Sequence, residues 1–264
     1  MIIAPQARKA GAGGVVSERG VYPDGMPHPT AQERRRIALE LGVLALLAGM
    51  FLGFLPIRSI ALEVGMALVG MGLVGLLARR TSEGLWGVPA SPDFERFRRC
   101  TIAMVLLTLP PILVFAIYGA WDAYASSGEQ ATFVEILGAM GTRLFRWHFF
   151  VTLLLYVPWA LVQQFLFQFY LLARWRALLP YASPWFLALV NGFFYGAMHL
   201  PQWPVAIVTM IGGFVWSYSY LRDRYVWPLA VSHAVLASTF YYWACNSDLL
   251  GNLANSLVLR PLGG

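Results

Sequence analysis

Long apolar stretches separated by short polar segments run along the chain from residue 37 to residue 243. A helix needs about 20 apolar residues to cross a bilayer, and seven of these stretches approach or exceed that length. Backbone groups in lipid must be hydrogen-bonded within the segment, so these stretches are predicted to be helices. They lack the alternation of a barrel strand. The predicted transmembrane helices are 37–55, 60–78, 101–118, 147–172, 185–199, 205–221 and 226–243.

This pattern predicts an all-α fold, a polytopic integral membrane bundle of about seven transmembrane helices (six to eight). The composition agrees, because 58% of the residues are hydrophobic and 12% are charged, about half the charged fraction of a typical soluble domain. Residues 1–36 contain scattered Pro, Gly and Arg without an apolar core, which predicts a disordered cytoplasmic tail and no signal peptide. The bundle is predicted to span 37–264, with N-terminal helices in 37–118 and a functional core in 144–243.

The basic residues predict the orientation of the bundle. With the N-terminus in the cytoplasm, 15 of the 19 Lys and Arg residues lie on the cytoplasmic side and 4 lie outside. The positive-inside rule favours this topology, which places the C-terminus outside and suits a bacterial inner (plasma) membrane. The net charge of +6 is then explained by topology and indicates no nucleic-acid partner. Membrane lipid is the expected partner, because anionic lipid attracts such charges.

The connecting segments carry three further predictions. Residues 84–99 are interpreted as a cytoplasmic linker with a basic end. Residues 133–144, within the outer segment 119–146, have the pattern of an amphipathic helix that lies on the membrane surface. The adjacent prolines Pro110 and Pro111 are expected to kink or break the third helix.

Polar side chains at membrane depth are energetically expensive, so they are the first candidates for function. They gather in three predicted helices: Gln163, Gln164 and Gln168; Asn191, Tyr195 and His199; and Ser232 and His233. A spacing of four residues places Gln164 and Gln168 on one helix face. The same spacing places Asn191, Tyr195 and His199 in one polar stripe. Two interpretations stay open, a shared polar cavity or hydrogen bonds that only hold helices together.

Several kinds of site are excluded by the motifs. No His is followed by Glu, no Asp lies at membrane depth, and no Ser follows a Gly-x pair. These absences exclude the H-E-x-x-H zinc site, the aspartyl dyad and the rhomboid serine arrangement. Two histidines without carboxylate or thiolate partners make a poor metal site, so neither a metal nor another cofactor is expected. Cys100 and Cys245 lie on opposite faces of the predicted membrane, so no disulfide is expected, and His148 is interpreted as structural.

The order and spacing of these polar residues resemble the CPBP family of intramembrane proteases, which includes CAAX prenyl endopeptidases and bacterial Abi proteins. That family is characterised by E-E-x-x-x-R on one helix, F-x-x-x-H on the next, and H-x-x-x-N on a later helix. The corresponding segments here are Gln163-Gln164-x-x-x-Gln168, Tyr195-x-x-x-His199 and His233-x-x-x-Ala237. The resemblance covers approximately residues 144–243.

The departures from the family pattern bear on the mechanism. In the family, the first Glu is thought to activate water with help from the first His, while the other His and the Asn polarise the carbonyl. Both glutamates are Gln here, the Arg is Gln168 and the Asn is Ala237. A carboxamide cannot act as a general base. Replacing Glu, Glu and Arg together removes the buried charges as a set, so that no charge is left unpaired.

Three functional hypotheses follow. In the first, the protein is a membrane endopeptidase with a modified site that binds and cleaves a membrane-tethered or C-terminal peptide. Its catalytic residues would be His199, His233, Gln163 and Gln164, and its substrate-binding residues Gln168, Asn191, Tyr195 and Ser232. In the second, the protein is an inactive relative that binds a peptide as a chaperone, immunity factor or accessory protein. In the third, it is a transporter-like or scaffold protein whose polar stripes only connect helices.

The predicted depths of the two histidines conflict. His233 lies near the cytoplasmic side on this topology, while His199 ends a helix that runs outward. At 1.5 Å per residue the difference in depth approaches about 15 Å. A short or deeply set fifth helix would remove this difference in depth. The two histidines can share a cavity only if the difference is removed.

Overall fold

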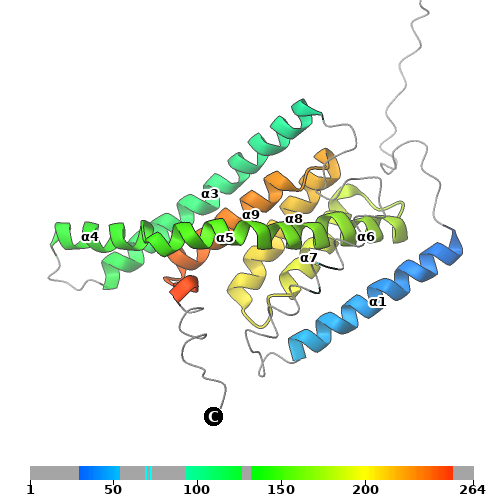
Figure 1. Ribbon diagram of the computed structural model, residues 1–264, viewed down its shortest axis with the longest axis horizontal. Helices are drawn as coiled ribbons and strands as arrows, with labels where there is room; N and C mark the ends of the chain where they lie inside the picture. Colours follow the sequence, from blue (N-terminus) through cyan, green and yellow to red (C-terminus); the bar gives the residue numbers. More distant parts are fainter. Residues whose placement is uncertain (1–29, 54–68, 70–71, 73–92, 127–131, 252–264) are drawn as a thin grey trace, which may run out of the picture.

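The computed structural model describes residues 30–53, 69, 72, 93–126 and 132–251, and all regular structure within them is helical (Figure 1). The prediction of an all-α bundle is therefore confirmed. The longer elements are α1 (Ala31–Gly53), α3 (Phe94–Ser126), α4 (Phe133–Leu144), α5 (Trp147–Gln164), α6 (Leu172–Leu178), α7 (Pro184–Ala197), α8 (Trp203–Asp223) and α9 (Trp227–Thr239). Two π-helical segments, η2 (Phe165–Leu171) and η3 (Phe240–Ala244), extend α5 and α9.

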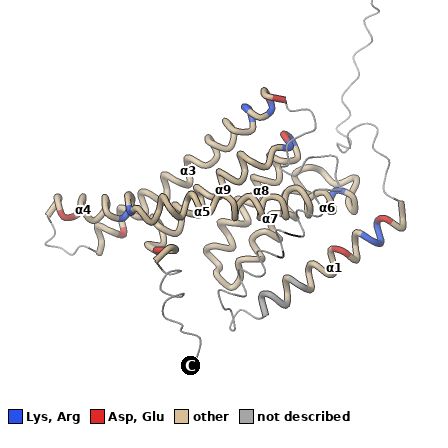
Figure 2. The backbone as a smooth tube through the Cα atoms, in the orientation of Figure 1, with Lys and Arg blue, Asp and Glu red and all other residues tan. Residues whose placement is uncertain are grey.

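Three helical stretches of the described residues are long and apolar enough to cross a membrane: α3, the 46 residues Phe133–Leu178, and α8. The second predicted span, 60–78, lies outside the described residues apart from positions 69 and 72, which are both helical. The predicted tail 1–36 lies outside them up to residue 29, and residues 31–36 belong to α1. Most charged residues lie toward the helix ends, and long uncharged stretches of helix lie between them (Figure 2), as expected for a membrane bundle.

The two prolines of α3 do not break it, since the helix runs without interruption from Phe94 to Ser126. Proline removes a backbone hydrogen bond, but membrane helices tolerate it where neighbouring helices pack against them. Along its length α3 packs against α9 and η3. Because α3 begins at Phe94, the end of the predicted linker 84–99 is helical, and the earlier part lies outside the described residues.

The amphipathic segment forms α4 with the predicted bounds, Phe133–Leu144. A capping box begins it, because the Glu135 carboxylate accepts from the backbone N–H of Thr132 at 2.8 Å while the Thr132 hydroxyl accepts from the backbone N–H of Glu135. This reciprocal pair satisfies two free donors at the helix start. In Figure 1, α4 and α5 run nearly in line. The position of α4 on a membrane surface stays a prediction.

The contact between α7 and α8 depends on glycines that allow the two backbones to approach closely. A Cβ at Gly192 would lie 2.6 Å from the backbone nitrogen of Phe214, and one at Gly196 would lie 2.6 Å from the carbonyl oxygen of Ala206. On the facing helix, a Cβ at Gly213 would lie 2.7 Å from the Cβ of Tyr195. Tyr195 of α7 therefore packs directly against Gly213 of α8.

Candidate functional site

The first polar segment lies where α5 changes into the π-helix η2. Gln163 and Gln164 end α5, and Gln168 lies within η2. A π-helical segment shifts the side chains after it relative to a regular helix and is frequent at functional sites. Gln164 and Gln168 are completely buried, whereas Gln163 is only partly buried. The three glutamines therefore have different surroundings, although they belong to one motif.

Tyr195 of α7 lies at the centre of the site and is completely buried. Its hydroxyl donates to Gln163 Oε1 at 3.4 Å and lies 3.1 Å from His233 Nδ1. One phenolic proton cannot serve both partners, so when Tyr195 donates to Gln163 the Nδ1–H of His233 donates to the tyrosine oxygen. Residues from α5, α7 and α9 are thereby linked in one chain of hydrogen bonds, which we call the Tyr195 site.

His199 lies in the turn after α7, and its ring is almost parallel to that of Tyr195. Its Nδ1 lies 3.1 Å from the Tyr195 carbonyl oxygen and 3.3 Å from Thr209 Oγ1. The ring centroid of Tyr195 is 6.3 Å from that of His199 and 5.7 Å from that of His233. The two histidine rings therefore cannot be 15 Å apart. The conflict in depth is removed because α7 has only 14 residues and ends at Ala197.

Gln168 and Asn191 form a separate cluster between helices. The Asn191 Nδ2 lies 3.2 Å from Gln168 Oε1, 3.1 Å from the Phe167 carbonyl oxygen and 2.8 Å from Ser217 Oγ. The side chains of Gln168, Asn191 and Ser217 are completely buried, so this cluster connects η2, α7 and α8. For Gln168 and Asn191 this geometry agrees with the interpretation that polar side chains hold the helices together. Their role in substrate binding stays a prediction.

Gln164 differs from its neighbour Gln163. Both polar atoms of its side chain are buried without a hydrogen-bond partner in the described part of the chain. An unsatisfied buried polar group costs about 1–3 kcal/mol. The described contacts therefore place Gln163, and not Gln164, in the hydrogen-bonded chain of the Tyr195 site.

The hydroxyl of Ser232 connects three helices. Its hydroxyl lies 2.8 Å from Thr108 Oγ1 of α3 and accepts from Trp216 Nε1 of α8 at 3.2 Å. The Trp216 ring in turn packs on His233, with 4.6 Å between the ring centroids. Ser232 thus supports the Tyr195 site through Trp216, and its contact with a substrate stays a prediction.

Sequence reasoning missed several residues around His233. The ring of Tyr156 lies edge-on to His233 with 5.7 Å between centroids. Its spacing of seven residues from Gln163 was a usable signal, because residues two turns apart share a helix face. Thr108 and Trp216 lie on other helices, so no spacing within one helix identifies them.

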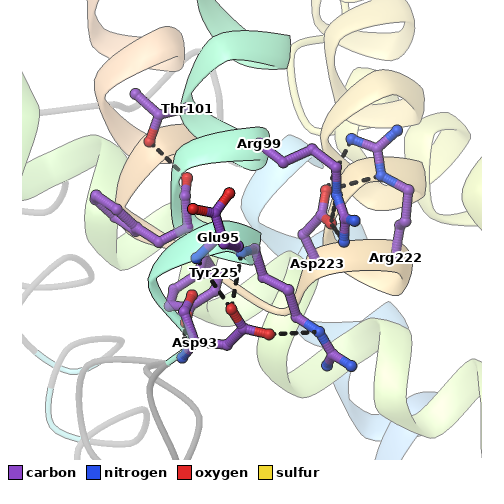
Figure 3. A network of polar contacts seen from close by, with 9 residues as sticks. Asp93, Glu95, Arg99, Thr101, Arg222, Asp223 and Tyr225 are labelled. Carbon is purple, nitrogen blue, oxygen red and sulfur yellow. Dashed lines mark hydrogen bonds and ion pairs between the residues drawn. The ribbon is translucent and has the colours of Figure 1, made fainter.

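The segment from residue 145 to residue 239 contains one carboxylate side chain, Asp223. Arg99 contacts its Oδ1 through Nε at 2.9 Å and Nη2 at 2.6 Å. Arg222 contacts its Oδ2 through Nε at 2.8 Å and Nη2 at 2.7 Å (Figure 3). Asp223 lies at the charged end of α8, and both of its oxygens are occupied. Among the described residues, no group of three or more His, Cys, Asp or Glu side chains is arranged to hold a metal.

Comparison with known families supports the resemblance found in the motifs. A family model described as Type II CAAX prenyl endopeptidase Rce1-like matches residues 145–239. The matched segment runs through α5, α7, α8 and α9 and includes all three motifs. The match covers about a third of the chain, and it shows that this segment is similar to that family. The long apolar helices agree with a membrane protein. No curated protein and no solved structure matches the chain significantly.

Proposed function

We propose that this protein binds a membrane-tethered or C-terminal peptide at the Tyr195 site and does not hydrolyse it. The observation that carries the proposal is the lack of an available carboxylate. The matched segment has one carboxylate residue, Asp223, and two arginines occupy it at the charged end of the bundle. In the part of the chain that the structure describes, neither Tyr195 nor His233 contacts a carboxylate, so the glutamate-based activation of water that the family resemblance implies has no base there.

The Tyr195 site offers groups that suit a peptide backbone. Gln163 accepts from Tyr195 through Oε1, which leaves its Nε2 to donate to a peptide carbonyl. Aromatic rings surround the polar atoms, with Phe167 4.1 Å and Trp216 5.5 Å from the Tyr195 ring between centroids. A few convergent polar groups within apolar walls are typical of a binding site.

Peptide capture tests this proposal. A membrane-tethered peptide library with a photoreactive group is incubated with the purified protein in lipid, and crosslinked peptides are identified by mass spectrometry. Tyr195→Phe keeps the ring and removes the hydroxyl that organises Gln163 and His233, so binding is expected to weaken about 5- to 10-fold. Tyr118→Phe, at an exposed position of α3, is the matched control. Equal capture by the wild type and Tyr195→Phe contradicts the proposal.

A histidine-based endopeptidase is the second candidate, and the contact between Tyr195 and His233 favours it. With the Nδ1 proton of His233 held toward the tyrosine oxygen, Nε2 carries a lone pair that can accept a proton from water. The water oxygen would then attack the peptide carbonyl carbon. The proton would pass from Nε2 to the leaving amine as the C–N bond breaks.

Cleavage of the same peptides distinguishes the two candidates. Intact bound peptide from the wild type supports binding without hydrolysis. Fragments that disappear in both His199→Ala and His233→Ala establish a histidine-based protease instead. A triple variant, Gln163→Glu, Gln164→Glu and Gln168→Arg, restores the family pattern. Cleavage by this variant alone supports a binding cavity that no longer hydrolyses peptides.

We further propose the predicted orientation, with the N-terminus in the cytoplasm of a bacterial cell and the C-terminus outside. The surplus of basic residues on the cytoplasmic side supports it. Alkaline phosphatase fused after Gly264 is expected to be active, because this enzyme requires the oxidising exterior. An inactive fusion, with an active fusion at Met1, contradicts the orientation.

A further inference from the structure

An open apolar groove lies between α3 and α9, on the side of α9 away from Tyr195. It has a volume of about 520 Å³, and its wall includes Phe97, Thr101, Val105, Leu109, Trp227 and Val231. Val105, Leu109 and Val231 are each about half exposed, at 53%, 47% and 47%. In a membrane bundle such side chains face lipid, so the groove is accessible from the bilayer.

The groove contains hardly any free polar group. Three hydroxyls line it, and all three have partners. Those of Thr108 and Ser232 lie 2.8 Å apart, and the Thr101 hydroxyl donates to the Phe97 carbonyl oxygen at 2.9 Å. It therefore suits an unbranched apolar chain and offers nothing to a peptide backbone. From Phe97 to Ile112 it follows fifteen residues of α3, about 22 Å at 1.5 Å per residue. That length exceeds half of the hydrocarbon thickness, about 15 Å, so one acyl chain of one leaflet fits along it.

A basic cluster lies at one end of the groove. It contains Arg96, Arg98, Arg99, Arg222 and Arg224 against the carboxylates Asp93, Glu95 and Asp223. Figure 3 shows Arg99 and Arg222 of this cluster with the three carboxylates. The cluster keeps a net charge of about +2 within the described residues. Asp223 is completely buried and held by two arginines, so the positive charge faces outward.

Arg98 is the arginine that continues the lining of the groove. It precedes Thr101 by three residues and Val105 by seven, which places all three on one face of α3. Helical side chains lean toward the helix N-terminus, so the guanidinium extends beyond the apolar part of the groove. Its partner is Glu95, which accepts from Nε and Nη2 at 3.1 and 2.7 Å. The Arg98 and Glu95 side chains are 59% and 70% exposed, so this pair is weak and Nη1 can donate to a further anion.

We propose that this groove binds an anionic phospholipid, with one acyl chain along α3 and α9 and the phosphate on Arg98. The charge of the cluster selects an anionic headgroup, and the apolar groove holds the chain. This site is separate from the Tyr195 site and does not depend on the proposed peptide binding. The Ser232 side chain lies between the two sites, since it lines the groove and contacts Trp216.

Native mass spectrometry of the purified protein in detergent tests the site. Phosphatidylglycerol and phosphatidylcholine with identical acyl chains are added in turn. One arginine near an anionic lipid changes affinity by about fivefold. Phosphatidylglycerol is therefore expected to bind about fivefold more tightly than phosphatidylcholine. Arg98→Gln is expected to abolish this preference. The control variant is Arg35→Gln, which makes the same charge change on another helix. Arg35 is exposed on α1, and α1 packs against α6. This variant is expected to leave the preference intact.

A second pair of variants tests the acyl chain. Val231→Trp fills the groove from a lipid-facing position and is expected to lower binding of both lipids, as is Val105→Trp from the opposite wall. Ile211→Trp, at a similarly exposed position of α8, is expected to change neither. Lipid binding is compared only among variants that melt at the same temperature as the wild type. A preference for phosphatidylglycerol that survives Arg98→Gln, or lipid binding that survives both groove-filling variants, overturns the proposal.

Discussion

Replacing Gln164 with leucine is expected to stabilise the protein, whereas the same change at Gln163 is expected to destabilise it. Both residues end α5 and are adjacent in one motif. Gln164 is completely buried, and neither of its amide atoms has a partner among the described residues. Gln163 accepts a hydrogen bond from Tyr195. Leucine carries no polar atom and is somewhat smaller than glutamine, so each variant removes one amide and leaves an apolar side chain in its place.

The magnitudes follow from these contacts. Removing a buried, unsatisfied amide recovers about 1–3 kcal/mol of free energy of unfolding. The Gln163 bond is long, at 3.4 Å, so its loss is expected to cost about 0.5–1 kcal/mol. In a chain of this size, 1 kcal/mol corresponds to about 2–4 °C in melting temperature. The apparent melting temperature is therefore expected to rise by about 2–12 °C in Gln164→Leu and to fall by about 1–4 °C in Gln163→Leu.

Tryptophan fluorescence during heating in detergent measures both shifts at one scan rate, because membrane-protein unfolding is often irreversible. The reasoning is refuted if Gln164→Leu melts below the wild type. That result would mean that the Gln164 amide has a partner, such as a buried water, and belongs to the polar site. Gln164→Met provides a second apolar variant in case leucine packs poorly.

Three further predictions concern other contacts. Arg99→Ala is expected to lower the free energy of unfolding, because it removes both contacts to one oxygen of the buried Asp223 carboxylate. The midpoint of chemical denaturation checks this prediction, and an unchanged midpoint contradicts it. The second prediction concerns Asp248, whose Oδ2 lies 2.6 Å from His148 Nδ1. Burial alone would raise the pKa of Asp248. Hydrogen bonds from the Gly251 N–H, His148 and Tyr242 outweigh burial and lower this pKa from its ordinary value of 3.8. The stability from these contacts is therefore fully present above about pH 4 and is lost as the pH falls through the lowered pKa. The protection of backbone amides from hydrogen exchange in the segment after η3 is expected to fall only below about pH 4. A loss of protection between about pH 7 and 5 contradicts this assignment. Gly192→Val is expected to separate α7 from α8 and cost about 1–3 kcal/mol or more, because even a Cβ there would lie 2.6 Å from the α8 backbone; a melting temperature equal to that of the wild type contradicts it.

Hydropathy alone predicted most of the described helices, because long apolar runs must be helical in lipid. It failed at helix ends and interruptions. The predicted helix 185–199 ends at Ala197, since the apolar run continues into a turn that hydropathy cannot distinguish from a helix. Pro110 and Pro111 were expected to kink or break the third helix, and they do not interrupt α3, which packs against neighbouring helices that the local sequence does not record.

The candidate site was predicted in outline but not in its connections. Spacing placed Asn191, Tyr195 and His199 in one stripe, yet Asn191 joins Gln168 while Tyr195 joins His233. Which partner each side chain meets depends on how α5, η2 and α8 are rotated against α7. The π-helix alters that rotation, and nothing in the helical period predicts it.

The measurement that tests the central claim most directly is the mass of the peptide recovered from the purified protein in lipid. After incubation with membrane-tethered peptides, the wild type is predicted to retain intact peptide, and Tyr195→Phe is predicted to retain about 5- to 10-fold less. Recovery of peptide fragments from the wild type, and none from His233→Ala, would contradict the account and establish hydrolysis without a glutamate base.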